Sequence, residues 1–591
     1  MPAPNASAEP PTSDIGALLS GLNAEQRAAA EAVRGAVCIL AGAGTGKTRT
    51  ITHRIAAQIV SQTARPDQVL AVTFTEKAAG ELRARLAALE VPGPVRAATF
   101  HAAAWAQLRF FWRRVSDQPL PEVLPSKLPL LGRAALKLRA EARDLASEIE
   151  WAKARGVEPE GYWAAAVGRD LPVPADVMAD VYAGYERAKA EQHAIDYEDM
   201  ILRTAVLLES DAEAAEVVRD RYRFLTVDEF QDVNPAQWRL LRAWLGDSDE
   251  LCVVGDDDQS IYGFTGATPE YLLTFTKRFP TARQFRLSRN YRSTPQILDL
   301  ANGVLGRRSA GRRLVAAGLP GPAPRLEEFA TGEDEVRGVT DAVAGLVGGG
   351  VRPGEIAICF RVNRQSEPFE SALRDAGIPY VVRGEGFFAQ PEVRQAVRAL
   401  RVAAEQAAAP PARGAVPPVG GAAPARPPRL DREVERVLRE ALAFHPKREP
   451  SGRAAKERWR NLTTLLELAR ARAQAGAATG LAAWVAELEE RAAAGHDTAD
   501  DNGAVTLVTL HKAKGLEFDA VFLVGVEEGL LPIGHAKDDG SIAEERRLLY
   551  VGVTRARRHL WISWARSRPG SGGGPSRRRP SRFLHWLRRR A

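Results

Sequence analysis

The residues best suited to chemistry lie in a glycine-rich segment near the start of the chain. The segment Ala41-Gly-Ala-Gly-Thr-Gly-Lys47-Thr48 follows an apolar stretch that is typical of a buried strand. Where such a loop passes into a helix, its backbone N–H groups and the positive end of the helix point at a phosphate group. We therefore predict that Lys47 reaches the β- and γ-phosphates of a nucleotide and that Thr48 binds its magnesium ion. The strict form of this motif begins with glycine, and Ala41 departs from it.

A second reactive group follows a later apolar stretch, where Asp228 and Glu229 stand side by side. Two adjacent acids are by themselves most often a solvated turn. Beside a phosphate-binding loop, however, Asp228 can bind magnesium while Glu229 orients and deprotonates a water molecule. Because phosphoryl transfer demands mainly that phosphate, metal and water be positioned, the two segments together predict hydrolysis of ATP with Mg²⁺.

Both segments need a sheet that brings them together, and the sequence predicts one. Short apolar stretches alternate with helical patterns from Leu22 to Phe100, which is typical of a parallel α/β sheet. The section from His101 to Glu191 has helical spacing only, so we interpret it as a helical insertion after which the sheet resumes. The predicted strands are Ala36–Leu40, Val69–Phe74, Phe224–Val227 and Leu251–Val254, and helices are predicted from Lys47 and through Ala78–Leu89. Acidic clusters follow the last two strands, at the sheet edge where ligands bind.

A second α/β pattern occupies the later part of the chain. Its predicted strands are Ile356–Phe360, Val505–Leu510, Ala520–Val524 and Leu560–Trp564. The pattern breaks off after Glu392, where helical spacing takes over again. Within this interruption, residues 407–429 are rich in Ala, Pro, Gly and Arg without periodicity, which indicates a flexible linker.

The composition favours a large enzyme that binds a polyanion. A chain of 591 residues is too long for one hydrophobic core, so we expect several domains. A formal net charge of +7 and a pI near 9.3 favour a phosphate-rich partner. Cys38, Cys252 and Cys359 each lie in an apolar stretch without metal-ligand spacing, so we expect neither disulfides nor zinc. With no secretion signal and no membrane-spanning stretch in the sequence, we predict a cytoplasmic protein.

Taken in order, the motifs resemble those of superfamily 1A DNA helicases of the UvrD, PcrA and Rep type, from Leu22 to Leu584. The strings that carry the resemblance are Leu22-Asn-Ala-Glu-Gln26-Arg, Thr73-Phe-Thr-Glu-Lys77, Val254-Gly-Asp-Asp-Asp-Gln259-Ser-Ile-Tyr262, Asn290-Tyr-Arg-Ser, Phe360-Arg-Val-Asn363, Thr509-Leu-His511-Lys-Ala-Lys-Gly515-Leu-Glu517 and Tyr550-Val-Gly-Val-Thr-Arg555. The pattern is most similar to the second UvrD-like paralogue of actinobacteria. We expect the chain to lack the C-terminal cysteine cluster and helical nucleic-acid-binding domain of that group's longer members.

The resemblance implies an α/β fold of two RecA-like P-loop NTPase motor domains, each interrupted by a mostly α-helical insertion. The implied boundaries are 21–101 and 196–293 for the first motor domain, 102–195 for its insertion, 294–389 and 503–570 for the second motor domain, and 390–502 for its shortened insertion. We expect residues 1–20 to be a disordered N-terminal tail and residues 571–591 to be a basic, solvated C-terminal tail.

The resemblance also implies roles at the nucleotide. Gln26 is expected to recognise adenine, Tyr291 to stack on it and Glu517 to contact the ribose. Gln259 is the expected γ-phosphate sensor, Arg292 a γ-phosphate contact and Arg555 a second arginine finger. The predicted catalytic residues are Lys47, Glu229, Gln259, Arg292 and Arg555. The predicted nucleotide-binding residues are Gln26, Ala41, Gly42, Ala43, Gly44, Thr45, Gly46, Lys47, Thr48, Arg49, Tyr291 and Glu517, and the predicted magnesium ligands are Thr48 and Asp228.

The implied DNA contacts include aromatic rings, each of which can hold a base of any identity by roughly 1–3 kcal/mol of stacking. An isolated Phe or Tyr more often packs in a core, but within these motifs we interpret Phe74, Tyr262 and Phe264 as base platforms. The predicted DNA-binding residues are Phe74, Thr99, His101, Tyr262, Phe264, Asn363 and His511. Most family members have Arg-Trp-Arg where this chain has Gly263-Phe264-Thr265, which predicts a weaker or differently tuned grip.

The predicted function is an ATP-dependent DNA helicase that moves along single-stranded DNA, 3′ to 5′ by resemblance, and separates strands in DNA repair or replication. A translocase that displaces proteins without efficient unwinding is the alternative, and the sequence does not separate the two. An inactive ATP-gated scaffold is disfavoured because Lys47, Glu229 and Arg555 are all present. The predicted partners are single-stranded DNA, its junctions with duplex, and repair or replication proteins, with the chain a monomer or weak dimer at the nucleoid.

Overall fold

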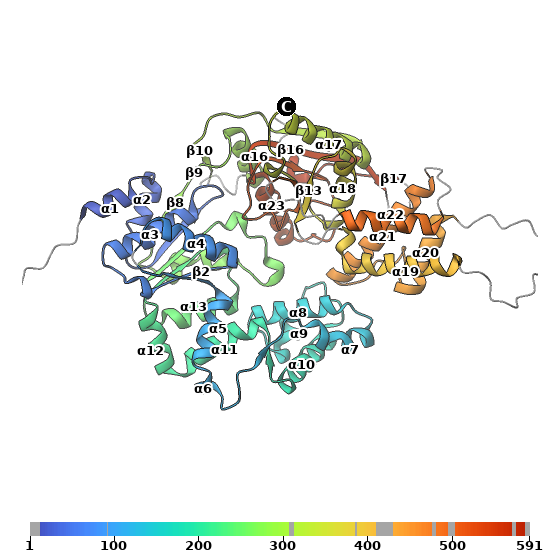
Figure 1. The fold of residues 1–591 in the computed structure, drawn as a ribbon. Helices are drawn as coiled ribbons and strands as arrows, with labels where there is room; N and C mark the ends of the chain where they lie inside the picture. Colours follow the sequence, from blue (N-terminus) through green and yellow to red (C-terminus); the bar gives the residue numbers. More distant parts are fainter. Residues whose placement is uncertain are drawn as a thin grey trace, which may run out of the picture. The chain divides into compact units, whose positions relative to one another are not determined.

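The computed structural model describes residues 12–91, 93–306, 313–383, 387–408, 429–474, 480–494, 503–569 and 575–585. The chain divides into two compact units, each with its own sheet (Figure 1). The first unit comprises Met1–Ser293 and Leu305–Leu319, and the second comprises Thr294–Val304 and Pro320–Ala591. Parallel sheets combined with helices confirm the predicted α/β class. In the described residues, no helix is long and apolar enough to cross a membrane.

The first unit is built on a six-stranded sheet in the order β3-β2-β6-β7-β1-β8, in which every neighbouring pair is parallel. Its strands are β1 (Val37–Ala41), β2 (Val69–Thr73), β3 (Arg96–Thr99), β6 (Phe224–Val227), β7 (Leu251–Gly255) and β8 (Arg283–Leu287). The order places β1 and β6 on either side of β7. The carboxyl ends of these three strands therefore meet at one edge of the sheet, where the two reactive segments begin.

Helices cover both faces of this sheet. Successive residues of a strand point to opposite faces, and here the residues on both faces are apolar. Val37 and Ile39 of β1 pack with Ile51 and Ile55, whereas Cys38 between them packs in the cluster of the opposite face. The helices of this part are α1 (Thr12–Leu19), α2 (Ala24–Ala30), α3 (Lys47–Val60), α4 (Glu76–Ala88), α5 (Phe100–Phe110), α11 (Tyr197–Ser210), α12 (Ala212–Arg221), α13 (Pro235–Leu245), α14 (Glu270–Leu273) and α15 (Phe275–Arg278).

The first helical insertion has a core of its own, which includes Leu145, Ile149, Tyr162 and Met178. Its elements are α6 (Trp112–Val115), β4 (Glu122–Val123), α7 (Leu128–Leu138), α8 (Ala142–Ala154), α9 (Tyr162–Ala165), α10 (Ala175–Glu191) and β5 (Ala194–Ile195). The strands β4 and β5 form a two-residue parallel pair at the base of the insertion, which the sequence did not predict. The rest of the described insertion is helical, as expected.

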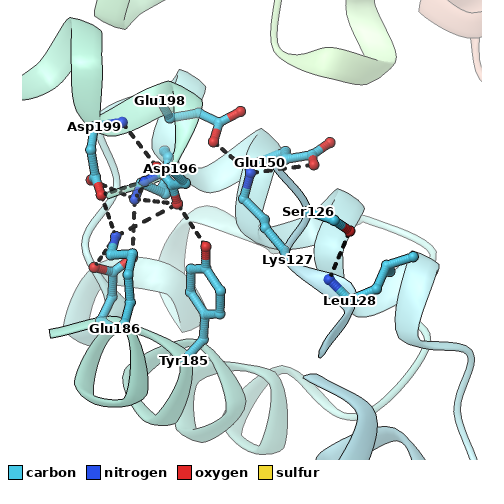
Figure 2. A network of polar contacts seen from close by, with 11 residues as sticks. Ser126, Lys127, Leu128, Glu150, Tyr185, Glu186, Asp196, Glu198 and Asp199 are labelled. Carbon is cyan, nitrogen blue, oxygen red and sulfur yellow. Dashed lines mark hydrogen bonds and ion pairs between the residues drawn. The ribbon is translucent and has the colours of Figure 1, made fainter. Parts of the chain in front are cut away.

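A buried cluster of charges joins this insertion to the start of α11 (Figure 2). Lys153 Nζ lies 2.8 Å from Asp196 Oδ2 and 2.6 Å from Asp199 Oδ1. Lys189 Nζ lies 2.5 Å from Asp199 Oδ2, and the Tyr185 hydroxyl donates to Asp196 Oδ2 at 3.0 Å. Because Asp196 also caps α11 by accepting from the Asp199 N–H, the ion pairs fix the point where the chain returns to the sheet.

The second unit contains a six-stranded path, β11-β16-β15-β12-β14-β13, whose neighbours are all parallel. A seventh strand, β17, pairs with β16 in the antiparallel sense. The strands are β11 (Arg325–Thr331), β12 (Ile356–Phe360), β13 (Tyr380–Arg383), β14 (Val505–Thr509), β15 (Phe518–Leu523), β16 (Ala556–Pro569) and β17 (Pro575–Arg577). The central strands β12 and β14 are buried apolar stretches, which is why the sequence located them.

The helices of the second unit fall into two groups. Those beside the sheet are α16 (Pro295–Leu305), α17 (Gly332–Gly348), α18 (Ser366–Asp375) and α23 (Asp539–Val553). Those of the second insertion are α19 (Pro391–Ala408), α20 (Leu430–Leu442), α21 (Arg453–Gln474) and α22 (Leu481–Ala494). The second group packs around a separate apolar core that includes Leu400, Leu438, Leu465 and Trp484.

The expectation of two unstructured tails is wrong where the structure describes them. Residues 12–19 form α1, and Leu19 is buried against Leu22, Ala30 and Ala57. Near the other end, Phe583 and Leu584 are buried and β17 pairs with β16. Both segments are ordered because they bury apolar side chains. Residues 1–11, 570–574 and 586–591 lie outside the described residues.

Two further expectations concern the connections. Most of the predicted linker, 409–428, lies outside the described residues, while Ala407 and Ala408 end α19. Residues 305–319 group with the first unit rather than the second, because β10 (Val315–Ala316) pairs with β9 (Arg289–Asn290). The remaining domain boundaries stay predictions.

Candidate nucleotide-binding site

The glycine-rich loop connects the end of β1 at Ala41 to the start of α3 at Lys47. Gly44 and Gly46 have φ values of 67° and 83°, in the left-handed region that glycine enters at no steric cost. A Cβ atom on Gly44 would lie 2.5 Å from Asn290 Nδ2, and one on Gly46 would lie 2.6 Å from Gln26 Nε2. Both positions therefore require glycine. Ala41 is buried within the strand, before the tight part of the loop, so its side chain is accommodated.

Side chains from two other segments hold the loop in shape. Gln26 Nε2 donates to the Thr45 carbonyl at 2.9 Å, and Asn290 Nδ2 donates to the Ala43 carbonyl at 2.6 Å. The Tyr291 N–H donates to the Gly44 carbonyl at 2.8 Å. These contacts engage three carbonyl groups of the loop, so that its backbone N–H groups are available to a phosphate. Asn290 was not among the predicted site residues, although it lies beside two of them.

The residues expected to recognise adenine are linked to the same segments. Asn23 Nδ2 donates to the Tyr291 hydroxyl at 2.7 Å, and Asn23 and Gln26 form the capping box of α2. Tyr291 is 51% exposed, so its ring remains open to a stacking partner. Arg49 lies exposed on the first turn of α3 and donates to the Gly21 carbonyl at 2.9 Å. The structure thus brings Gln26, Tyr291 and Arg49 around the loop.

Lys47 and Glu229 form an ion pair, with Lys47 Nζ 3.0 Å from Glu229 Oε1. Burial opposes the charge on Lys47, but three carboxylates outweigh that effect and raise its pKa; they belong to Glu229, Asp256 and Asp228. Burial and the adjacent Glu229 carboxylate raise the pKa of Asp228 to about 7, although Lys47 opposes the shift. The end of β6 therefore gathers more negative charge than Lys47 alone balances.

This excess of carboxylate fits a divalent cation. Bound Mg²⁺ would favour the charged form of Asp228, and Thr48 lies one residue after Lys47 on the first turn of α3. Among the described residues, no cluster of three or more acidic, histidine or cysteine side chains could hold a metal by itself. Nucleotide-dependent Mg²⁺ sites use one or two protein ligands plus phosphate oxygens, which matches this donor set.

Glu229 stands in a left-handed backbone conformation, with φ 51° and ψ 41°. For a residue with a side chain this conformation costs energy, and it persists where surrounding contacts enforce it. Its N–H donates to Asp228 Oδ1 at 2.8 Å, and its Oε2 accepts from Gln231 Nε2 at 2.5 Å. In this turn the Glu229 carboxylate contacts Lys47.

A chain of hydrogen bonds runs from Glu229 to the predicted sensor. Gln231 Oε1 accepts from the Asp256 N–H at 2.9 Å, and Asp256 Oδ2 accepts from Gln259 Nε2 at 2.7 Å. Gln231 and Asp256 were not among the predicted site residues. Their acidic or amide character was visible in the sequence, but the contact depends on the neighbouring positions of β6 and β7.

The predicted DNA platforms of the first unit follow this chain. Tyr262 and Phe264 lie edge to face with ring centroids 6.2 Å apart, and Phe264 is 36% exposed. Burial raises the pKa of Tyr262 to about 12, so its hydroxyl stays protonated. Gly266, two residues after Phe264, lies close to Ala154 of α8. A Cβ atom added to Gly266 would lie 3.2 Å from the Cβ of Ala154. Two aromatic rings thus stand on a turn directly connected to the nucleotide site.

The other predicted DNA residues of this unit lie near the ends of β2 and β3. Phe74 is half-buried and meets Phe100 edge to face at 5.8 Å. Thr99 is the N-cap of α5, accepting from the Ala102 N–H at 3.1 Å, so its hydroxyl has a structural role. His101 packs edge to face on Tyr197 at 6.1 Å, and burial together with Lys127 lowers its pKa.

The second unit contains the predicted residues Arg555, Glu517, Asn363 and His511. Arg555 is buried and donates to the Val551 carbonyl at 2.9 Å and the Leu516 carbonyl at 3.1 Å. Glu517 accepts from Arg557 Nη2 at 2.7 Å. Asn363 begins the short turn after β12, and His511 follows β14, so both stand at the carboxyl ends of neighbouring strands.

Comparison with known proteins decides the family. The model of the UvrD/REP helicase N-terminal domain matches residues 22–280, and that of the UvrD-like helicase C-terminal domain matches residues 285–409 and 429–567. The chain belongs to the UvrD-like helicase family. Its membership confirms the predicted family, the P-loop NTPase fold and the class of enzyme, a helicase.

Named relatives of this helicase cover nearly its whole length. ATP-dependent DNA helicase UvrD2 of Mycobacterium tuberculosis is 47% identical over 96% of this chain and 82% of its own length. DNA helicase II of Escherichia coli is 32% identical over 97% of this chain and 88% of its own. ATP-dependent DNA helicase PcrA of Staphylococcus epidermidis is 30% identical over 96% and 87%. The similarity to the second mycobacterial UvrD-type helicase agrees with the predicted subgroup.

Proposed function

We propose that this helicase uses ATP and Mg²⁺ to move along single-stranded DNA in the 3′-to-5′ direction and to separate duplex strands. The observation that supports this most directly is the chain of contacts from Lys47 through Glu229, Gln231 and Asp256 to Gln259. It links a phosphate-binding loop to a turn that carries aromatic rings. An ATPase that drives movement needs such a link between hydrolysis and grip.

At the nucleotide, Lys47 would bind the β- and γ-phosphates, and Thr48 and Asp228 would hold the metal. When bound, Mg²⁺ would neutralise part of the charge on the phosphate oxygens. Glu229 orients and deprotonates the attacking water, while Gln259 and Arg292 sense the γ-phosphate. Arg555, from the second unit, stabilises the charge of the transition state, a contribution worth about 10³–10⁵ in rate for arginine fingers. Glu517 contacts the ribose.

On DNA, the proposed platforms Phe74, Tyr262 and Phe264 stack on bases, and Thr99, His101, Asn363 and His511 contact the strand. Stacking tolerates any base, so the grip suits a motor that must pass over every sequence. Because Phe264 replaces the tryptophan of most relatives, each step relies on a smaller ring. Repair or replication proteins as partners, a monomeric or weakly dimeric state, and action at the nucleoid are part of the same proposal.

A translocase that strips proteins from single strands is the second candidate. The segment Gly263-Phe264-Thr265 favours the translocase. Its phenylalanine ring is smaller than tryptophan and it lacks the two flanking arginines, which weakens the DNA binding that unwinding requires. Fluorescent duplexes with a 3′ tail, a 5′ tail or a fork, together with streptavidin displacement from biotinylated single strands, separate the candidates. Unwinding from the 3′ tail supports the helicase. Streptavidin displacement without unwinding supports the translocase, and unwinding from the 5′ tail contradicts the direction.

A further inference from the structure

Gln231 occupies the point where β6 and β7 meet the nucleotide site. It lies in the short 3₁₀ turn Phe230–Asp232 directly after Glu229, and its side chain is completely buried. A buried amide must satisfy both its N–H donors and its carbonyl acceptor, or it costs stability. The partners it has found therefore show which groups it holds in place.

Both ends of the Gln231 amide are engaged. Its Nε2 donates to Glu229 Oε2 at 2.5 Å, and its Oε1 accepts from the Asp256 N–H at 2.9 Å. The reverse amide orientation would put the oxygen against a carboxylate and an NH₂ group against an N–H, so the assignment is chemically forced. In addition, the Ser260 hydroxyl donates to the backbone carbonyl of Gln231 at 3.3 Å.

The Gln231 side chain packs closely against Gly255 at the end of β7. A Cβ atom on Gly255 would lie 2.6 Å from Gln231 Oε1 and 3.2 Å from its backbone N, so glycine at the end of β7 permits the close approach. From Asp256 the contact continues to Gln259, whose Nε2 donates to Asp256 Oδ2 at 2.7 Å. One amide thus ties the Glu229 carboxylate, just after β6, to the loop after β7.

We propose that Gln231 is a positioning residue for hydrolysis, which fixes the Glu229 carboxylate and couples it to the loop bearing Gln259, Tyr262 and Phe264. The inference rests on the proposed ATPase function. Glu229 is held on one oxygen by Lys47 and on the other by Gln231. When a γ-phosphate draws Lys47 away, Gln231 keeps the carboxylate in place to receive the water proton. Movement of the DNA-binding turn then reaches Glu229 through the same amide.

The substitution Gln231→Glu tests this with little change in shape. The new carboxylate still accepts from the Asp256 N–H but faces the Glu229 carboxylate without a donor. We expect kcat for ATP hydrolysis with single-stranded DNA to fall at least tenfold. KM for ATP, the Kd of a fluorescent ATP analogue and the Kd of a labelled oligonucleotide stay within about twofold, because no binding group is touched.

Gln107→Glu is the matched control. Gln107 is also buried, and its Oε1 accepts from Trp244 Nε1 at 2.7 Å, a bond that a carboxylate retains. Its Nε2 has no hydrogen-bond partner among the described residues, so no donor is lost. The control reports the general effect of burying a carboxylate in this unit, and we expect its kcat to stay close to that of the wild type.

Gln231→Met provides a second variant, which keeps the length of the side chain but makes neither bond. We expect it to lose DNA stimulation of hydrolysis while binding both ligands. The proposal is overturned if both Gln231 variants hydrolyse ATP like the wild type, or if Gln107→Glu loses kcat to the same extent. A wild-type protein that binds the ATP analogue yet shows no hydrolysis with DNA instead contradicts the proposed function, and this inference with it.

Discussion

The Lys47 ammonium and the Glu229 carboxylate lie 3.0 Å apart and neutralise each other across the ends of β1 and β6. The group expected to bind phosphate is thus paired with the group expected to activate water. In the proposed mechanism, an incoming triphosphate competes for Lys47 and releases one oxygen of Glu229. Nucleotide binding and exposure of the proposed general base would then be coupled, because both depend on one ion pair.

Replacing Lys47 with methionine breaks this pair while keeping most of the side chain. We expect hydrolysis to fall at least a hundredfold and affinity for ATP to fall, because the phosphates lose their cation. Steady-state hydrolysis and titration with a fluorescent ATP analogue check both effects. Lys137→Met on α7 is the control, since Lys137 is an exposed lysine outside the predicted site. Hydrolysis that survives in Lys47→Met would contradict the assignment.

Asn290 is predicted to maintain the shape of the phosphate-binding loop. Besides its bond to Ala43, its Oδ1 accepts from the Arg292 and Ser293 N–H groups, each at 2.8 Å. Removing a fully buried group of this kind costs roughly 1–3 kcal/mol. We expect Asn290→Ala to raise KM for ATP about tenfold or more. Asn461→Ala, which removes a buried asparagine from the second unit, should leave KM unchanged.

The charge cluster of Figure 2 should make the first unit sensitive to acid. Burial would raise the pKa of Asp196, but Lys153, Lys189 and Lys127 hold it well below its usual value. A depressed folded-state pKa contributes stability above about pH 4, the unfolded value, and the contribution is lost as pH falls toward the folded value. Lys153→Met should lower the unfolding free energy by about 3–5 kcal/mol near pH 7. Denaturant melts between pH 3 and pH 8 test this, and equal loss at every pH would contradict it.

The pKa of Glu467 on α21 is shifted in the opposite direction from that of Asp196. Burial raises its pKa to about 7, although Arg364, Arg470 and Arg578 oppose the shift. A raised folded-state pKa favours the folded protein at low pH, and that advantage disappears as pH rises through about 7. Glu467→Gln should therefore stabilise the second insertion by about 1 kcal/mol at pH 8, after allowance for partial exposure, and have little effect at pH 5. A melting temperature that falls at pH 8 would rule this out.

The strands that the sequence located are those buried on both faces. The stretches Phe224–Val227 and Ile356–Phe360 agree with β6 and β12 at both ends, because continuous apolar residues mark a central parallel strand. The strands it missed include β3, β8, β11 and β13, which stand at the ends of the two strand orders. An edge strand such as β8, Arg283–Leu287, is polar on its exposed side and carries too weak a pattern.

For the site, too, local sequence patterns predicted some residues and missed others. Lys47 and Glu229 could be singled out from local spacing alone, and the structure brings the two side chains together. Asn290 and Gln231 could not, because their roles depend on which strands are neighbours; Asn290 reaches a carbonyl 247 positions away in the sequence. Resemblance supplied the role of Arg555, and the structure adds that backbone carbonyls of its own unit hold its guanidinium group.

The most direct test of the proposed mechanism is steady-state ATP hydrolysis with and without single-stranded DNA, for the wild type and for Glu229→Gln. The proposed mechanism predicts that DNA strongly stimulates the wild type. It also predicts that the substitution abolishes hydrolysis while affinity for the oligonucleotide survives, because Glu229 prepares water and does not hold the strand. Hydrolysis that ignores DNA in the wild type, or that persists in Glu229→Gln, would contradict it.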